Sequence, residues 1–215
     1  AYVSVGFNGG GSMTVMDNGS FSNNDDFSVN ESGDVPATLT LQDSGTMSIG
    51  GQVFVGRNTG RVGTVTQTGG TFTAAAANEF QIGKYGTGSW LQSGGVTNAG
   101  GWVSIGRETG GTGVLTVSGT GTFNQTGADR AMIVGENGTG TLTVQPGATV
   151  SSVGSNGVIV SNNAAGVGTV NLDGGTLAVV KLTDGGGTST FNFNGGTLVA
   201  GAGANAAFMG GLDAA

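Results

Sequence analysis

The sequence contains no cysteine and no histidine, only two prolines, and few charged residues. Without cysteine it has no disulfide scaffold or thiolate metal site, and without histidine it has no imidazole base or Ser–His nucleophile. Charged residues make up 9% of the chain, against a usual share of about 25%. No apolar run approaches the roughly 18 residues of a membrane span. We therefore expect no cofactor, no metal and no membrane span in this segment.

The formal net charge is −7, which disfavours a nucleic-acid partner. Glycine accounts for 47 of 215 residues, but without the three-residue period of collagen. Val, Thr and Ile recur regularly, which is typical of strands and not of a disordered chain. The stretch AYVSVG opens directly on this pattern, so we expect that a leader has been removed or that the chain is a segment of a longer protein.

A four-residue motif recurs along the chain: an apolar residue, any residue, Val or Ile, and a small residue. Its copies, spaced 23 to 29 residues apart, are VSVG (3–6), FSVN (27–30), VFVG (53–56), FQIG (80–83), VSIG (103–106), MIVG (132–135) and VIVS (158–161). Each copy is followed by a second alternating segment such as TLTV (141–144), a turn rich in Gly, Asn or Asp, and a third short strand. A repeat that recurs about every 25 residues is typical of a solenoid.

Three short strands per period predict an all-β fold, a right-handed parallel β-helix of about eight coils. Equivalent strands would stack about 4.8 Å apart, so their inward side chains would form three apolar columns. The first column is Val5, Val29, Val55, Ile82, Ile105, Val134 and Val160. The second is Met13, Leu39, Val65, Trp90, Leu115, Leu142, Val170 and Phe191. The third is Phe21, Met47, Phe72, Val96, Phe123, Val150, Leu177 and Leu198.

The corners of each coil need residues that tolerate a positive φ. Glycine adopts this conformation at the lowest cost, and Asn or Asp at the next lowest. This requirement explains the excess of glycine and the Asn at position 30, where other coils have a small residue.

Three stretches, IVGENGTGTLTVQPGATVSS, SIGRETGGTGVLTVSGTGTFNQ and VNLDGGTLAVV, resemble the repeats of autotransporter (type V secretion) passengers and of PEP-CTERM-type surface proteins. The final stretch, FNFNGGTLVAGAGANAAFMGGLDAA, resembles the strand repeat associated with autotransporter passengers. The resemblance implies a β-helical stalk, located outside the cell or on the outer surface of a Gram-negative bacterium. It implies no defined activity, because such repeats are scaffolds.

We expect a parallel β-helix domain over residues 1–200 and an Ala/Gly-rich C-terminal segment over 201–215. That segment would lead to a cap, a further coil or a neighbouring chain. An uncovered solenoid end exposes unpaired backbone groups and favours pairing with another chain. The expected partners are therefore a second copy, further coils of a longer chain, or cell-surface glycans.

Outward threonines of the second strand would form two hydroxyl columns on a flat face. The candidate ligand residues are Thr38, Thr40, Thr64, Thr66, Thr141 and Thr143. Such an array would match a carbohydrate or ice lattice, although threonine also suits any exposed strand. Leu91 and Val114 interrupt the columns, which argues against a dedicated ice-binding plane.

Cations follow the first strand in three successive coils. Arg57, Lys84 and Arg107 would form a stripe able to hold an anionic partner, or would serve as solvated turn residues that keep the surface soluble. Exposed aromatics near turns, among them Trp102, could stack on sugars or seal a lateral contact.

Turn acids supply the one candidate for catalysis. Asp17 and Asp43 would lie about 5 Å apart in adjacent coils, a carboxyl separation that polysaccharide-cleaving enzymes use. Other coils carry ordinary turn residues there, so a turn-forming role is the simpler explanation. A weak Ca²⁺ site is a further possibility at residues 25–34, where Asp25, Asp26 and Glu31 cluster with Asp34. We therefore expect a non-catalytic structural or adhesive protein, with glycan or ice binding as the first alternative and polysaccharide degradation as the second.

Overall fold

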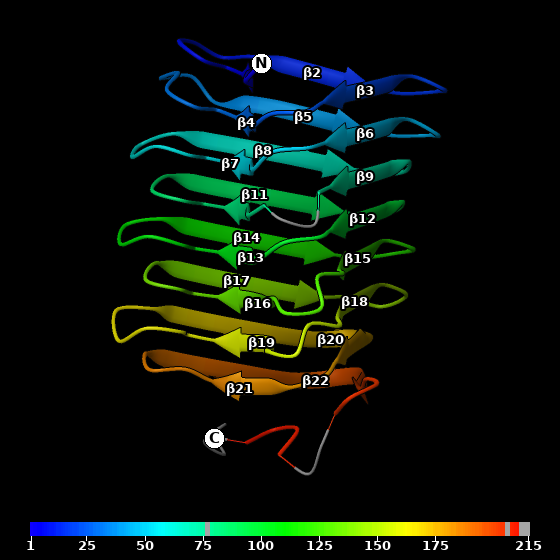
Figure 1. Ribbon diagram of the computed structural model, residues 1–215, viewed down its shortest axis with the longest axis vertical. Helices are drawn as coiled ribbons and strands as arrows, with labels where there is room; N and C mark the ends of the chain where they lie inside the picture. The colour runs from blue at the N-terminus through cyan, green and yellow to red at the C-terminus, as the bar shows by residue number, and fades with distance from the viewer. Residues whose placement is uncertain (76–77, 205–206, 211–215) are drawn as a thin grey trace.

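The computed structural model describes residues 1–75, 78–204 and 207–210, and shows a parallel β-solenoid in which these residues form no helix. Successive rungs stack along the long axis, with the N-terminus at one end and the C-terminal segment at the other (Figure 1). Every pairing between neighbouring rungs is parallel, for example β14 with β17 and β16 with β19. Eight rungs, or about seven full turns from first to last, confirm the predicted fold class.

Each rung begins with a short strand in an eight-stranded sheet, which we call the first sheet. Its strands are β1 (Val3–Val5), β4 (Phe27–Val29), β7 (Val53–Val55), β10 (Phe80–Ile82), β13 (Val103–Ile105), β16 (Ala131–Val134), β19 (Gly157–Val160) and β21 (Leu182–Asp184).

Two further strands follow in each of rungs 1 to 6. Those at the second position are β2 (Ser12–Val15), β5 (Ala37–Leu41), β8 (Val62–Gln67), β11 (Thr87–Gln92), β14 (Thr112–Val117) and β17 (Thr139–Val144). Those at the third position are β3 (Ser20–Asn23), β6 (Thr46–Ile49), β9 (Thr71–Ala74), β12 (Val96–Ala99), β15 (Thr122–Gln125) and β18 (Thr149–Ser152). In rungs 7 and 8 a single long strand fills both positions, β20 (Val167–Val179) and β22 (Thr188–Ala200).

The continuous strands β20 and β22 differ from the three-strand prediction. The turns DGGT and NGGT were expected to separate two strands, but pairing continues through them with a register shift after Leu172. Gly174 and Gly196 have φ values of 105° and 96°, wider than the 55° of Asp43 at the corresponding turn of rung 2. Glycine alone tolerates this wider conformation easily, so the chain crosses the corner as a bulged strand.

The first two predicted columns are confirmed along their whole length. Val5 pairs with Val29, and the series continues by register to Val160. Leu115 lies between Trp90 and Leu142, and Leu142 pairs with Val170. Most of these side chains are fully buried, and burial of apolar area stabilises the fold by about 25 cal/mol per Å². In the middle rungs Trp90 packs edge-on against Phe72 with ring centroids 5.0 Å apart, a favourable aromatic geometry.

The third column is wrong at one position. Val96 pairs with Thr71 on the outer side, while Thr97 pairs with Phe72 and takes the inward place. Thr97 is fully buried, and its hydroxyl donates a hydrogen bond of 2.6 Å to Oε1 of Gln67. The interior therefore accepts a hydroxyl where the sequence pattern favoured valine, because the buried Gln67 amide in the preceding rung accepts its hydrogen bond.

Buried glutamines hold the corners between the second and third strands. Gln67 and Gln92 end β8 and β11 with inward side chains that are almost completely buried. Nε2 of Gln92 donates to the carbonyls of Gly95 and Thr122, both at 3.0 Å. Each side chain thus links the turn of its own rung to the next rung, which satisfies buried backbone groups at the corner.

The corner after each first strand confirms the prediction for position 30. Asn30 has a φ of 60°, and the matching Gly56 and Gly83 have φ values of 68° and 70°. Ser161 occupies the same corner with a φ of 61°, which its residue type does not favour. Its hydroxyl donates to the carbonyl of Gly166 at 3.1 Å, a local bond that stabilises the corner.

Glycine has a second structural use in the rungs. An inward column of glycines stands at the second residue of β8, β11, β14, β17 and β20: Gly63, Gly88, Gly113, Gly140 and Gly168. A Cβ on Gly140 would lie 2.1 Å from the carbonyl oxygen of Ile105 and 2.3 Å from the nitrogen of Gly135. In these five rungs the second strand passes directly against the corner that follows the first strand, so glycine fits best. Ala37 in rung 2 and Ser189 in rung 8 take the same place in the column.

The stretch KLTD (181–184), which departs from the repeat motif, forms the eighth strand of the first sheet. Leu182 pairs with Val158 and Asp184 with Val160, so a carboxylate stands at the end of the first apolar column. Beneath this strand, the Leu182 nitrogen donates to the carbonyl of Phe208 at 2.8 Å, and Phe208 packs against the core. Part of the C-terminal segment therefore covers the end of the first sheet.

Candidate functional site

The six candidate threonines lie in two columns on the outer side of the second-position strands. Thr38 pairs with Thr64, and Thr40 pairs with Thr66. Thr141 and Thr143 continue the same columns three rungs further on, after Ser89 and Leu91 and then Val114 and Thr116. Neighbouring hydroxyls interact along a column, since Oγ1 of Thr38 donates to Oγ of Ser12 at 3.2 Å. The two hydroxyl columns are therefore regular along the face, except where the apolar residues Leu91 and Val114 interrupt them.

A third column on this face was not found from the sequence. From rung 3 to rung 8 the second-position strands begin two residues earlier than predicted and add an outward row: Val62, Thr87, Thr112, Thr139, Val167 and Thr188. The signal that could have revealed it is the Thr-Gly or Val-Gly pair before the predicted strand in rungs 3 to 7, in which the glycine points inward. The three columns together give a lattice of about 4.8 Å between rungs and about 6.7 Å along each strand.

The three cations of the predicted stripe do occupy successive rungs. The Lys84 nitrogen donates to the carbonyl of Gly56, and the Arg107 nitrogen to that of Gly83. Glu31 precedes Arg57 in this column, and Nη1 of Arg57 lies 3.1 Å from Oε1 of Glu31. At the other end, Arg107 pairs with Glu79 and lies 3.9 Å from Oε2 of Glu136. Carboxylates therefore neutralise both arginines of the stripe.

The pKa values of these groups follow from the same contacts. Partial burial by itself lowers the pKa of Arg57, but the charge and hydrogen bond of Glu31 outweigh it, so this pKa lies above its ordinary value. The pKa of Tyr2 is also raised, by burial first and then by its hydrogen bond to Glu31. Lys84 has no carboxylate within ion-pair distance among the described residues, and its ammonium lies 5.3 Å from the ring centroid of Phe54. An anionic partner for the stripe stays a prediction, and Lys84 is its least neutralised cation.

The turn acids Asp17 and Asp43 are exposed and have positive φ values of 53° and 55°. Aspartate is among the few residues that adopt this conformation readily, so the backbone accounts for its presence in both turns. Asp173, in the corresponding turn of rung 7, accepts a hydrogen bond of 2.8 Å from Asn194. These acids lie in the corners between the second and third positions, away from the groove described below.

The carboxylates of residues 25–34 interact with different partners. Oδ1 of Asp26 accepts from the Gln52 nitrogen at 2.8 Å, while Glu31 pairs with Arg57 and Asp34 pairs with Arg61. Within the ranges that the structure describes, no group of three or more His, Cys, Asp or Glu side chains is arranged to hold a metal ion.

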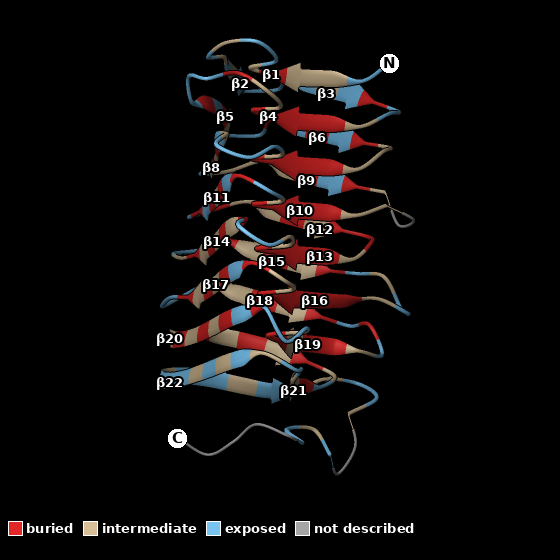
Figure 2. Cartoon of the chain, turned by 90° about the vertical axis from the view of Figure 1, so that its left-hand side faces the viewer, coloured by how far each residue is buried: buried red, intermediate tan, exposed pale blue. Residues whose placement is uncertain are grey.

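The last rung has an open edge. β22 pairs with β20 on one side, and no described residue pairs with its other side. The inward residues of β22 are consequently uncovered from below, and Phe193 is 56% exposed, although Leu172 above it is fully buried. Figure 2 shows β22 exposed or half-buried at the C-terminal end, whereas first-sheet strands such as β13 and β16 are buried.

No family model, curated protein or solved structure matches this chain. The class that the architecture itself defines is the parallel β-solenoid. The likeness to autotransporter passengers and PEP-CTERM-type surface proteins stays an expectation from the repeat motif. In the described part of the chain, no helix is long and apolar enough to cross a membrane.

Proposed function

We propose that the protein is a non-catalytic structural and adhesive rod, exposed outside the cell or on the outer surface of a Gram-negative bacterium. The observation that carries the proposal is the open edge of β22 beneath a continuous apolar core. A rung added there would find thirteen residues of strand backbone to pair with, and the uncovered faces of Phe191, Phe193 and Leu198 to bury. The rod would thus extend by the same stacking that forms its own interior.

The first rung offers the matching surface at the opposite end. Met13 and Phe21 begin the second and third columns, and both are only half-buried, whereas Leu39 and Met47 in the next rung are buried. Contact between the last rung of one copy and the first rung of another would continue two columns across the junction. Such a head-to-tail contact does not close on itself and generates filaments.

Electron microscopy of the 215-residue chain tests this assembly. Seven steps of about 4.8 Å give a stack of about 34 Å from first to last rung, so assemblies appear as rods longer than this. We expect rod length and light-scattering mass to rise with protein concentration. Phe193→Lys places a charge in the junction and should leave monomers, while Thr190→Lys, which faces outward from the same strand, should assemble normally.

Two results would contradict the assembly proposal. One is a wild-type chain that stays monomeric at every concentration tested. The other is equal assembly by both lysine variants, which would place the contact on a side face and not at the β22 edge.

A second candidate function is recognition of a carbohydrate or ice lattice by the threonine columns. The third column favours it, because it widens the regular array from two rows to three. Thr40→Tyr combined with Thr66→Tyr should abolish binding to insoluble polysaccharide or ice without lowering the melting temperature. Ser48→Tyr with Thr73→Tyr, on the outer side of the third-position strands, is the matched control. Unchanged binding by the threonine variant would dismiss this candidate.

A further inference from the structure

The outer side of the first sheet forms a trough along the solenoid axis. The middle residue of each strand alternates away from the core, yet in β4, β7, β10 and β13 it is buried. These residues are Ser28, Phe54, Gln81 and Ser104. The segments before and after each strand therefore rise above the sheet and form two walls, with the middle residues as the floor.

In the N-terminal half, the protein's own side chains fill this trough. The guanidinium of Arg57 lies 4.2 Å from the ring centroid of Phe54, and the Lys84 ammonium lies 5.3 Å from it. One rung further on, Nε2 of Gln81 donates to Glu79 at 2.6 Å. These contacts explain why outward residues are buried there.

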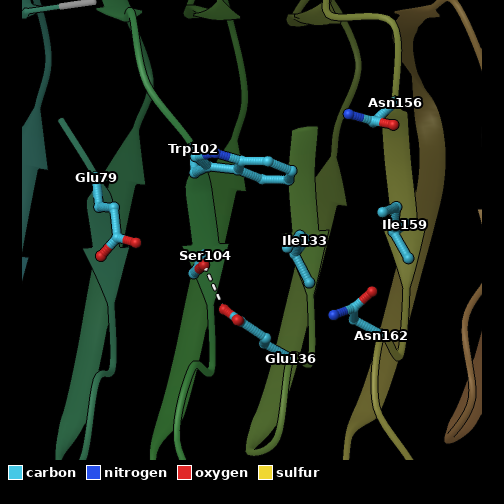
Figure 3. Close-up of a pocket in the computed structure, with 8 residues that line it drawn as sticks. All are labelled: Glu79, Trp102, Ser104, Ile133, Glu136, Asn156, Ile159 and Asn162. Atoms are coloured by element: carbon cyan, nitrogen blue, oxygen red, sulfur yellow. Dashed lines mark hydrogen bonds between the residues drawn. The ribbon is translucent and has the colours of Figure 1, made fainter. Parts of the chain in front are cut away.

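Further along the axis the trough opens into a groove of about 280 Å³. Its floor is Ser104, Ile133 and Ile159, from three successive rungs. Figure 3 shows Trp102 and Asn156 where the strands begin and Glu136 and Asn162 where they end, with the two isoleucines between them. Glu79, from the preceding rung, lines the end nearer the N-terminus, so the groove spans three steps, or about 14 Å.

The polar groups of this groove are held in place before any ligand binds. Oγ of Ser104, a buried residue, donates to Oε2 of Glu136 at 2.7 Å. Arg107 pairs with Glu79, and its Nε lies 3.9 Å from Glu136. Burial by itself lowers the pKa of Arg107, but these carboxylates outweigh it and raise the pKa above its ordinary value, so the guanidinium stays charged. Fixed side chains reduce the entropy lost on binding.

The groove combines apolar surface with a few placed polar groups, as small-ligand sites do. An indole face and two isoleucines suit the C–H face of a sugar ring, while carboxylates accept hydrogen bonds from hydroxyls and amides both donate and accept. The charges select among sugars. Glu79, Glu108 and Glu136 lie around Arg107, so these four side chains together carry a net negative charge that repels acidic groups.

We propose that this groove binds a short segment of a glycan that carries no acidic groups, with one sugar ring against Trp102 and its hydroxyls bonded to Glu136, Asn156 and Asn162. The proposal is independent of the assembly at β22 and of the threonine columns. It locates recognition on the first sheet, beside the end of the cation stripe at Arg107.

Calorimetric titration with three hexasaccharides tests the proposal: cellohexaose, the glucosamine hexamer and a heparin-derived hexasaccharide. We expect one of the first two to bind with a Kd below about 1 mM, and the heparin fragment to bind at least tenfold more weakly. Tryptophan emission gives an independent readout, because Trp90 is fully buried and Trp102 is the one other tryptophan of the chain. Binding should change that emission.

Binding measurements on variants test whether the glycan binds in this groove. Trp102→Ala and Glu136→Gln should each weaken binding about tenfold or more, while Phe7→Ala, which removes an exposed aromatic at the far end of the molecule, should not change it. Circular dichroism and the melting temperature confirm that each variant is folded. The proposal is overturned if neither uncharged nor amine-bearing hexasaccharide binds, if the heparin fragment binds more tightly, or if folded Trp102→Ala binds like the wild type.

Discussion

Replacing Gly140 by alanine tests whether the inward glycine column is explained by steric crowding or by backbone conformation. Gly140 does not have a positive φ, so its conformation suits any residue. A Cβ there would lie 2.1 Å from the Ile105 carbonyl oxygen and 2.3 Å from the Gly135 nitrogen. Relief to an ordinary contact requires a backbone shift of about 1 Å between strands that are paired on both sides.

The magnitude follows from the nature of these contacts. Overpacking costs about 1 to 3 kcal/mol when side chains can adjust, and here the neighbours are backbone atoms, so we expect a loss of about 3 kcal/mol. For a chain of this size, each kcal/mol lowers the melting temperature by about 2 to 4 °C. Gly140→Ala should therefore melt about 6 to 12 °C below the wild type in differential scanning calorimetry.

Alanine substitutions at two other glycines distinguish the effect of steric crowding from the effect of backbone conformation. Gly110 has a φ of 85°, and no atom lies within 4 Å of the place that a Cβ would take, so Gly110→Ala should cost about 1 kcal/mol from backbone strain alone. Gly9 has neither a positive φ nor a neighbour within 4 Å of that place, so Gly9→Ala should leave the melting temperature nearly unchanged. If Gly140→Ala melts no lower than Gly110→Ala, the explanation of the column by space is wrong.

Two further substitutions test the interior in opposite directions. Thr97→Val leaves the buried Oε1 of Gln67 without its 2.6 Å donor and should cost about 1 to 3 kcal/mol, while Thr97→Ser should retain most of the stability; a fully stable valine variant in thermal denaturation would contradict this role. Asp184→Val extends the column beneath Val160 and removes a buried carboxylate oxygen that lacks a hydrogen-bond partner, so it should raise the free energy of unfolding by about 1 kcal/mol. Asp184→Asn should bring no such gain, and a lower midpoint of urea denaturation for the valine variant would count against the argument.

The threonine columns and the cation stripe could be placed from the sequence, because parallel stacking converts position within a repeat into position in space. Thr38 and Thr64 are 26 residues apart in the chain and direct neighbours in the structure. The sequence could not predict which partner each of these side chains has in the structure. The charge of Arg107 is neutralised by Glu79, a residue of the preceding rung that belongs to no repeated motif.

The sequence by itself determined the solenoid, two complete columns and the corner at Asn30, since a motif that recurs about every 25 residues can bury its apolar positions only by stacking on itself. The tertiary structure decided the inward place of Thr97, the strand at KLTD, the glycine column and the groove beside Trp102. Each of these depends on how the connecting segments cross the ends of the strands. Those segments vary in length and residue type from rung to rung, so the repeat alone does not predict their path.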